Sequence, residues 1–295
     1  MEKRFDRSTE DLGNVVSLEH VNTRIPDQRL ATLFYMSGLG LTRDPFLMTG
    51  VDNMWANVGR SQFHLPTGEP QVVRGVTGLV VPGREALLKR LAAVREPLKD
   101  TLFAFKEHDD HVEAVSPWGN RIRCHEPSLG PAPRFGRIGL GMPYVELFAP
   151  VGTAPAIARF YREIMATPAH VADDGGVPRA IASVGPDQSL IFRETEEPQP
   201  EFDGHHVQIY LHDFSGPYQR LLERGLISQE DDQHQYRFID IVDVETNRVL
   251  FGIEHEVRSM RHPLYARLLV NRNPAQTNRD YMPDHDTWRG PYIPE

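Results

Sequence analysis

The sequence has little cysteine: Cys124 is the only one among 295 residues. A single thiol excludes an internal disulfide framework and any metal site built from several thiolates. A metal bound by this chain must therefore use histidine and carboxylate ligands.

Long apolar runs and concentrated positive charge are also missing. The longest apolar stretches, such as VTGLVV, are far shorter than the roughly 18 residues that a membrane span needs. No apolar segment follows the charged start MEKRFDRSTEDLG, so we expect a cytoplasmic protein without a secretory signal. The net charge of −9 and the lack of a basic stripe argue against a nucleic-acid partner.

What is present is the composition of a globular protein, with 40% hydrophobic and 25% charged residues. A chain of this length is typical of about two domains. We therefore looked for internal repeats, because they reveal architecture that local propensity does not.

Two segments of the chain follow the same plan. LEHVNTRIPDQRLATLFYMSGLGL has an alternating strand, a Pro-Asp turn and an amphipathic helix that carries an FY pair. YVELFAPVGTAPAIARFYREIMAT repeats this plan with a second FY pair. Each segment is followed by strands, a further helix and a final strand that opens after an Asn-Arg pair. This order indicates a duplication with two strand-helix-strands units in each half.

The linker between the halves is expected in PSLGPAPRFGRIG, which is rich in proline and glycine. The predicted domains are residues 15–128 and 138–258, each with two βαβββ modules that form one open barrel. Residues 259–295 lack a period, and we expect an extended C-terminal tail.

A strand, a helix ending in FY, a glycine and three strands, present twice per half, resemble the module of the vicinal oxygen chelate superfamily. The resemblance covers roughly residues 15–258 and implies an α+β fold of four βαβββ modules in two open barrels. Four modules in one chain most resemble the type I extradiol ring-cleaving dioxygenases. Glyoxalase I, fosfomycin-resistance enzymes and bleomycin-binding proteins share the module, so the site must decide the function.

The resemblance implies a metal site in the C-terminal half. Glu146 stands at the first-strand ligand position of the third module, and His206 stands at that of the fourth. HHVQIYLHD resembles the family motif in which the ligand histidine stands seven residues before an aspartate, which selects His206 rather than His205, and strand alternation lets only one of the two point inward. Leu250 occupies the usual final ligand position, so Glu254 is predicted as the third ligand only if a bulge or bend, such as one at Gly252, restores its place.

A rival site lies in the N-terminal half. His20 and His64 occupy matched first-strand and last-strand positions of the first module. No carboxylate accompanies them, and Arg123 stands at another expected ligand position, where its charge would repel a cation.

His234 and Tyr236 are the candidates for catalysis that the resemblance implies. Extradiol enzymes carry an acid/base histidine and a substrate-contacting tyrosine in this region before the last strand. On one strand the two side chains would share a face. The imidazole could exchange a catechol proton, and the phenol could orient an oxyanion.

The predicted function is a divalent-metal enzyme that acts on a small aromatic or vicinal-oxygen substrate, most concretely a ring-cleaving dioxygenase. Fe(II) is favoured as the cofactor, and Mn(II) or Zn(II) is an alternative; added carboxylate favours harder ions such as Mn(II). A glyoxalase-like lyase, isomerase or hydrolase would instead use the metal as a Lewis acid. A metal-free binding protein of the resistance type is the third alternative, and a homo-oligomer is possible in each case.

Overall fold

The structure is a computed structural model that describes residues 7–47, 52–128 and 134–271, and it consists of four βαβββ modules preceded by the short helix η1 (Arg7–Glu10). Module 1 contains β1 (Val15–Asn22), α1 (Gln28–Ala31), η2 (Thr32–Gly38), β2 (Thr42–Arg43), β3 (Asn53–Val58) and β4 (Ser61–Pro66). Module 2 contains β5 (Gly75–Val80), α2 (Arg84–Ala93), β6 (Ala104–Glu107), β7 (Val112–Val115) and β8 (Arg121–His125). Module 3 contains β9 (Gly141–Pro150), α3 (Ala154–Glu163), β10 (Ala169–Asp174), β11 (Val177–Gly185) and β12 (Gln188–Thr195). Module 4 contains β13 (His206–Leu211), α4 (Ser215–Leu222), β14 (Ile227–Asp232), β15 (Gln235–Val242) and β16 (Val249–Ser259).

Local sequence explains the helix that follows β1. Asp27 caps its N-terminus, because the side chain accepts hydrogen bonds from the Arg29 and Leu30 amides. The helix continues into η2, a π-helical stretch whose Phe34 and Tyr35 are fully buried. The second FY pair, on α3, is equally buried. Both pairs therefore form core, since an amphipathic helix buries one face.

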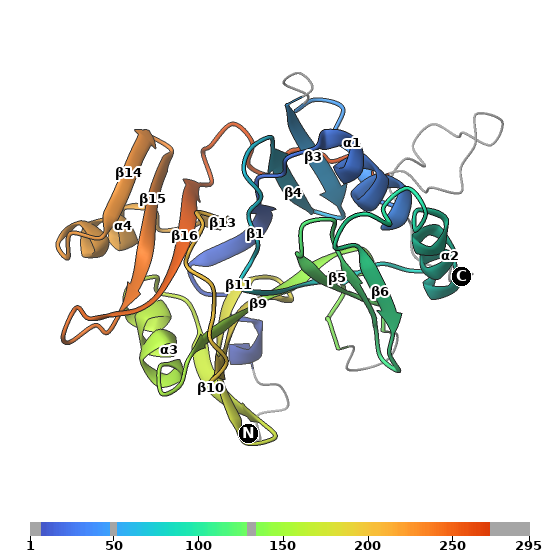
Figure 1. Ribbon diagram of the computed structural model, residues 1–295. Helices are drawn as coiled ribbons and strands as arrows, with labels where there is room; N and C mark the ends of the chain where they lie inside the picture. The colour runs from blue at the N-terminus through green and yellow to red at the C-terminus, as the bar shows by residue number, and fades with distance from the viewer. Residues whose placement is uncertain (1–6, 48–51, 129–133, 272–295) are drawn as a thin grey trace.

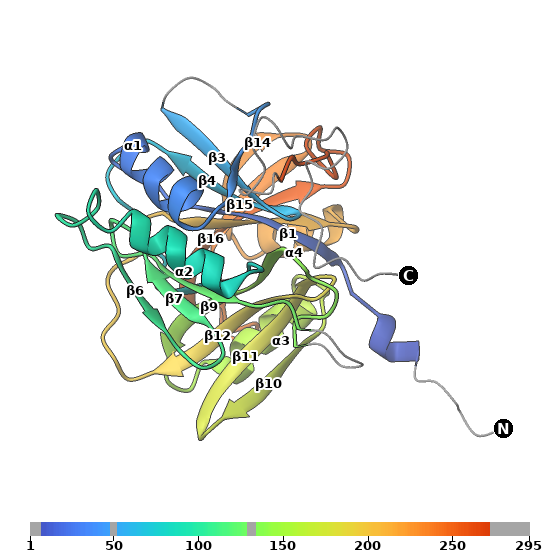
Figure 2. The same cartoon turned by 90° about the vertical axis from the view of Figure 1, so that its right-hand side faces the viewer.

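The modules combine into two eight-stranded sheets, and each sheet draws on both halves of the chain. The first sheet has the order β14-β15-β16-β13-β1-β4-β3-β2 and joins modules 1 and 4. The second has the order β10-β11-β12-β9-β5-β8-β7-β6 and joins modules 2 and 3. Figures 1 and 2 show β1, in blue, beside the orange strands of module 4.

The expectation that each half forms its own barrel is therefore wrong. The antiparallel pairs β1 with β13 and β5 with β9 cross between the halves and hold each sheet together. Neither sheet closes on itself, since β14 and β2 end the first sheet, and β10 and β6 end the second. The residue ranges 15–128 and 138–258 stay a prediction for the domains, and residues 129–133 of the expected linker lie outside the described residues.

The first sheet has two chemically different faces, because side chains alternate along each strand. On its helix face, Phe63 packs on Tyr35, Tyr236 on Phe214, and Phe238 on Phe160, with ring centroids 4.9 to 5.9 Å apart. These contacts join the first sheet to helices of three modules and form much of the core. We call the opposite side, which carries His20, His64 and His206, the polar face.

A bulge in β16 sets which of its residues reach the polar face. Phe238 pairs with His255, but Asp240 pairs with Gly252, so β16 carries one residue more than β15 between these pairs. A bulge bends its strand and re-aims the side chains that follow. Glu254 and Glu256 then stand beside His206 and Gln208 of β13. The bend expected near Gly252 is present.

The chain after β16 returns to module 1. Asn57 Nδ2 donates to the Val270 carbonyl, and Asn271 bonds both backbone groups of Gly59. Residues 272–295 of the predicted tail lie outside the described residues. Within the described part of the chain, none of the helices has the length and apolar character of a membrane span.

Candidate metal centre

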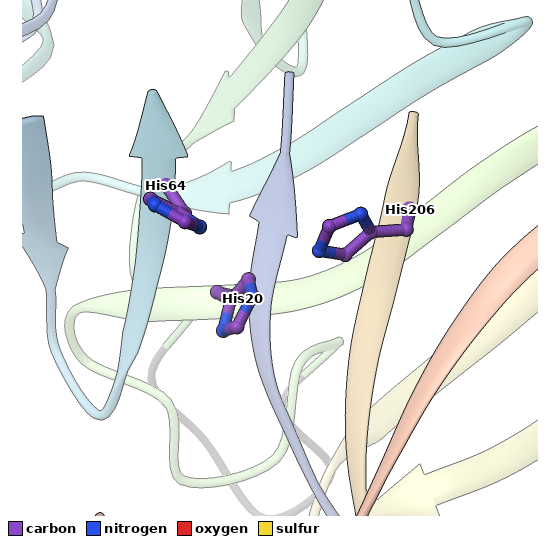
Figure 3. A group of neighbouring side chains, drawn as sticks. All are labelled: His20, His64 and His206. Carbon is purple, nitrogen blue, oxygen red and sulfur yellow. The ribbon is translucent and has the colours of Figure 1, made fainter. Parts of the chain in front are cut away.

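Three histidines from two modules meet on the polar face of the first sheet. His20 lies on β1, His64 on β4 and His206 on β13, and one ligand atom from each lies within 4.8 Å of the others. Figure 3 shows the three rings turned toward one another across neighbouring strands. The strand register explains the meeting, because Asn22 pairs with both His64 and His206, and His20 lies two residues earlier on the same face.

Each ring has a partner for one nitrogen outside the cluster. His20 Nδ1 lies 3.4 Å from Glu19 Oε2, and His206 Nδ1 lies 3.2 Å from Glu254 Oε1. His64 Nε2 lies 2.7 Å from Asn53 Oδ1. A hydrogen bond at one ring nitrogen orients the ring and leaves the other nitrogen as a ligand.

His20 provides the strongest sign that a group belongs between these rings. Its side chain is fully buried, and its Nε2 atom has no hydrogen-bond partner among the described residues. A buried unpaired nitrogen is costly, so native structures rarely leave one without a purpose. The donor set fits a divalent metal, for which imidazole nitrogen is a common ligand.

Glu256 supplies a carboxylate at the edge of the cluster. Its Oε2 lies 3.4 Å from His206 Nε2, and its Oε1 lies 2.6 Å from Arg258 Nη2. Arg237 spans Glu254 and Glu256. The carboxylates beside the histidines are thus already held by two guanidinium groups.

Burial and charge set the protonation of the cluster. Burial lowers the pKa of His20 well below its usual value and lowers that of His64 to about 2, so both rings are neutral near pH 7. Burial also opposes the charged form of His206, but hydrogen bonds to Glu254 and Glu256 outweigh burial and raise its pKa. Burial raises the pKa of Glu19 to about 7, against the nearby charge of Arg258. Neutral imidazole is the form that binds metal.

The set of three ligands predicted in the C-terminal half is not assembled. Glu146 lies on β9 in the second sheet, where its Oε1 is 3.3 Å from Arg123 Nη1. Among the described residues, His20, His64 and His206 form the one group of histidine, cysteine and carboxylate side chains close enough to share a metal. The structure therefore joins His206 of the first expected site to both residues of the rival site.

Arg123 was expected to repel a cation from the barrel of His20 and His64, but it belongs to the other sheet. It pairs there with Glu146 and also lies 3.7 Å from Glu113. Arg123 therefore does not oppose a cation at His20 and His64.

The predicted catalytic pair does not share a face. Tyr236 is buried on the helix face, where its ring packs against Phe214 and Tyr218 of module 4. It is thus turned away from the histidine cluster. His234 lies in the turn between β14 and β15, and its ring centroid is 6.5 Å from that of His262. The catalytic roles of His234 and Tyr236 stay predictions, and the structure does not bring Tyr236 to the histidine cluster.

His205 and His206, at the start of β13, turn to different partners. His206 joins the cluster, whereas the His205 ring turns to Asp203, with Nδ1 2.6 Å from Oδ1.

Sequence reasoning missed Glu256 and the cross-module pairing. One signal was available: module 1 offers two histidines without a carboxylate, and module 4 offers one histidine with two carboxylates on its last strand.

Comparison with known proteins agrees with this architecture. No protein-family model and no curated protein matches the sequence. Glyoxalase I from Zea mays aligns with a TM-score of 0.55 and 12% identity, over 82% of this chain and 92% of that chain. A proposed dioxygenase from Bacillus subtilis aligns with a TM-score of 0.53 and 18% identity, over 83% and 85% of the two chains. The chain therefore has the fold of the vicinal oxygen chelate superfamily, as its sequence predicts.

Proposed function

We propose that modules 1 and 4 together hold one divalent metal on His20, His64 and His206, with Glu256 as the neighbouring carboxylate. The observation that carries this proposal is the convergence of three imidazoles whose outer nitrogens are already bonded to Glu19, Asn53 and Glu254. Such outer partners raise the basicity of a ligand and fix its orientation.

The protein is proposed to be an enzyme that acts on a small substrate with vicinal oxygens, most concretely a ring-cleaving dioxygenase of a catechol with Fe(II). A bound metal would polarise the substrate oxygens, and iron would also supply redox chemistry toward dioxygen. Histidine and carboxylate donors on one face support iron. Glyoxalase I and the proposed dioxygenase share the fold and support a metal enzyme in general.

The chain's own residues would shape the site around the substrate. The Trp55 ring stacks on the His64 ring with centroids 3.8 Å apart and planes 12° apart. This contact fixes His64 and places a flat apolar wall beside the cluster, which suits an aromatic substrate. Arg237 holds Glu254 and Glu256 in place, so these carboxylates keep the His206 ring oriented.

A Lewis-acid enzyme is the second candidate, because three imidazoles are also a typical zinc set. Turnover without oxygen separates the two chemistries. A dioxygenase consumes oxygen in step with substrate, whereas a lyase, isomerase or hydrolase works equally well in an anaerobic chamber.

A protein that binds its ligand tightly without metal would support the resistance-type alternative.

The first test is metal content in purified variants, measured by inductively coupled plasma mass spectrometry. His20→Ala, His64→Ala and His206→Ala should each lower metal affinity. Loss of a residue that only hydrogen-bonds a metal ligand lowers affinity by roughly 10 to 100-fold, and loss of the ligand itself should lower it at least as much. His205→Ala is the matched control, because this neighbour is buried but bonded to Asp203. Glu146→Gln is the second control and should retain the metal.

Circular dichroism should show that all five variants remain folded. Wild-type protein that takes up no divalent metal, or histidine variants that retain it fully, would contradict the proposed centre. Loss of metal from Glu146→Gln but not from His20→Ala would return the site to the third module.

A further inference from the structure

Two glutamines flank His20 in the first sheet at equivalent places. Gln62 of β4 and Gln208 of β13 are both register partners of His20, one on each side. Both side chains are fully buried. Burial of an amide is unfavourable unless hydrogen bonds replace those lost to water, so each side chain needs partners.

Gln62 has these partners within the protein. Its Nε2 donates to Asn57 Oδ1 at 2.6 Å and to Asp44 Oδ2 at 3.0 Å. Its Oε1 accepts from Arg267 Nη2 at 3.3 Å. Gln62 is therefore a structural residue whose amide is fully used.

Gln208 has none. Neither its Oε1 nor its Nε2 has a hydrogen-bond partner among the residues that the structure describes. It lies two residues after His206 on the same strand face, between His20 on β1 and Glu256 on β16. A buried amide with two unpaired atoms lowers the stability of the fold and makes no contact that would offset this cost. Such an arrangement is expected where the amide binds a ligand.

Resting on the proposed function, we infer that Gln208 orients the substrate beside the metal by bonding one of its uncharged oxygens. An amide offers one acceptor and two donor hydrogens, so it matches a hydroxyl, which both donates and accepts. The nearby cations do not favour an anionic substrate. Arg237 is paired with Glu254 and Glu256, and Arg258 with Glu256 and Glu19.

The substrate class is therefore a small molecule with vicinal hydroxyl or carbonyl oxygens, rather than a carboxylate or a phosphate. A site built around an unpaired amide also discriminates against an analogue that lacks the hydroxyl, because the amide is then left unbonded.

The test compares Gln208→Met with Gln62→Met, two substitutions that keep an unbranched side chain of similar length. Zinc-reconstituted protein is titrated with catechol, phenol and salicylate by isothermal calorimetry. Wild-type protein should prefer catechol. Gln208→Met should weaken catechol binding by about tenfold or more, leave phenol binding unchanged and retain the metal.

Thermal melting gives an independent readout. Gln208→Met should melt at the wild-type temperature or above it, because it removes a buried unpaired amide, whereas Gln62→Met should melt lower because Asp44, Asn57 and Arg267 lose a partner. Unchanged catechol affinity in Gln208→Met overturns the inference. So does loss of the metal, which would make Gln208 a ligand, or a wild-type preference for salicylate.

These outcomes are distinct from failure of the proposed function. If wild-type protein holds no metal, or if His20→Ala retains it, the metal centre itself fails. If the metal is held normally by the histidines and catechol binding ignores Gln208, only the assignment of Gln208 fails.

Discussion

The buried histidines of this protein differ in how their ring nitrogens are used. In the proposed metal centre, His20 bonds a carboxylate through one nitrogen and leaves the other unpaired, and His205 outside it does the same with Asp203. A second kind of buried histidine uses both nitrogens: His255 contacts Tyr161 Oη and the Ile253 carbonyl, and His125 contacts Tyr144 Oη and the Asp110 carbonyl. Histidines of the second kind are structural.

His125 should therefore make stability depend on pH. Burial lowers its pKa to about 4, below the value of about 6.5 in an unfolded chain. Between these values the unfolded state binds more protons, so the contribution of His125 is complete above pH 6.5 and is lost as pH falls toward 4. The stability advantage of wild type over His125→Gln should shrink by on the order of 2 kcal/mol between pH 7.5 and 4.5.

Urea denaturation of both proteins across this range measures the effect. The exposed His170 provides the control, since His170→Gln replaces a surface side chain and should change stability by no more than about 0.5 kcal/mol. A constant difference between wild type and His125→Gln would contradict the role of His125 as a buried neutral ring.

At the scale of elements, the segment after β16 ties module 4 to module 1. Arg267 Nη2 lies 2.5 Å from Oδ2 of Asp44, whose side chain is fully buried. Asp44 also accepts hydrogen bonds from the Phe46 and Leu47 amides, and with Arg267 these hold its pKa below the usual value despite burial. The segment is thus anchored by a buried ion pair rather than by apolar contacts alone.

Removing the Arg267 cation alone should lower stability more than removing the charges of Arg267 and Asp44 together. Arg267→Ala leaves Asp44 as an uncompensated buried charge and should lower the free energy of unfolding by about 3 kcal/mol. The double variant with Asp44→Asn should regain part of that loss. The exposed Arg261 is the control, because Arg261→Ala should change stability by no more than about 0.5 kcal/mol. Equal effects of the two arginine substitutions in chemical denaturation would show that the segment is not anchored in this way.

At the scale of the whole molecule, the proposed metal centre cannot belong to one half of the chain. His20 and His64 come from module 1 and His206 from module 4, and the β1 and β13 pairing brings them together. The second sheet is equally shared, through the pairing of β5 with β9. Each half alone would expose two sheet edges that are covered in the intact protein.

Separate fragments of residues 1–128 and 134–295 should therefore be poorly folded and should not hold metal. Co-expression should restore both the circular dichroism spectrum and the metal content of the intact chain. An N-terminal fragment that folds and binds zinc alone would contradict the shared site. Intact protein prepared in parallel supplies the reference value for metal content.

Local sequence alone determined the modules. The strand and helix patterns and the buried FY pairs follow from short-range periodicity and from the repeat, whereas the ligand positions of His20, His64 and His206 are what the resemblance to the vicinal oxygen chelate module implies. Strand alternation also predicts that His205 and His206 face opposite ways, although it does not decide which of them faces the site. These features depend only on residues close together in the chain.

The tertiary structure decided which modules pair, and with that which histidines meet in the proposed site. Strand edges of modules 1, 2, 3 and 4 present similar backbone groups, so local pattern does not specify that β1 joins β13. That pairing placed His206 beside His20, and the pairing of β5 with β9 brought Glu146 into an ion pair with Arg123. The bulge in β16, which sets Glu254 and Glu256 against β13, likewise depends on its long-range register with β15.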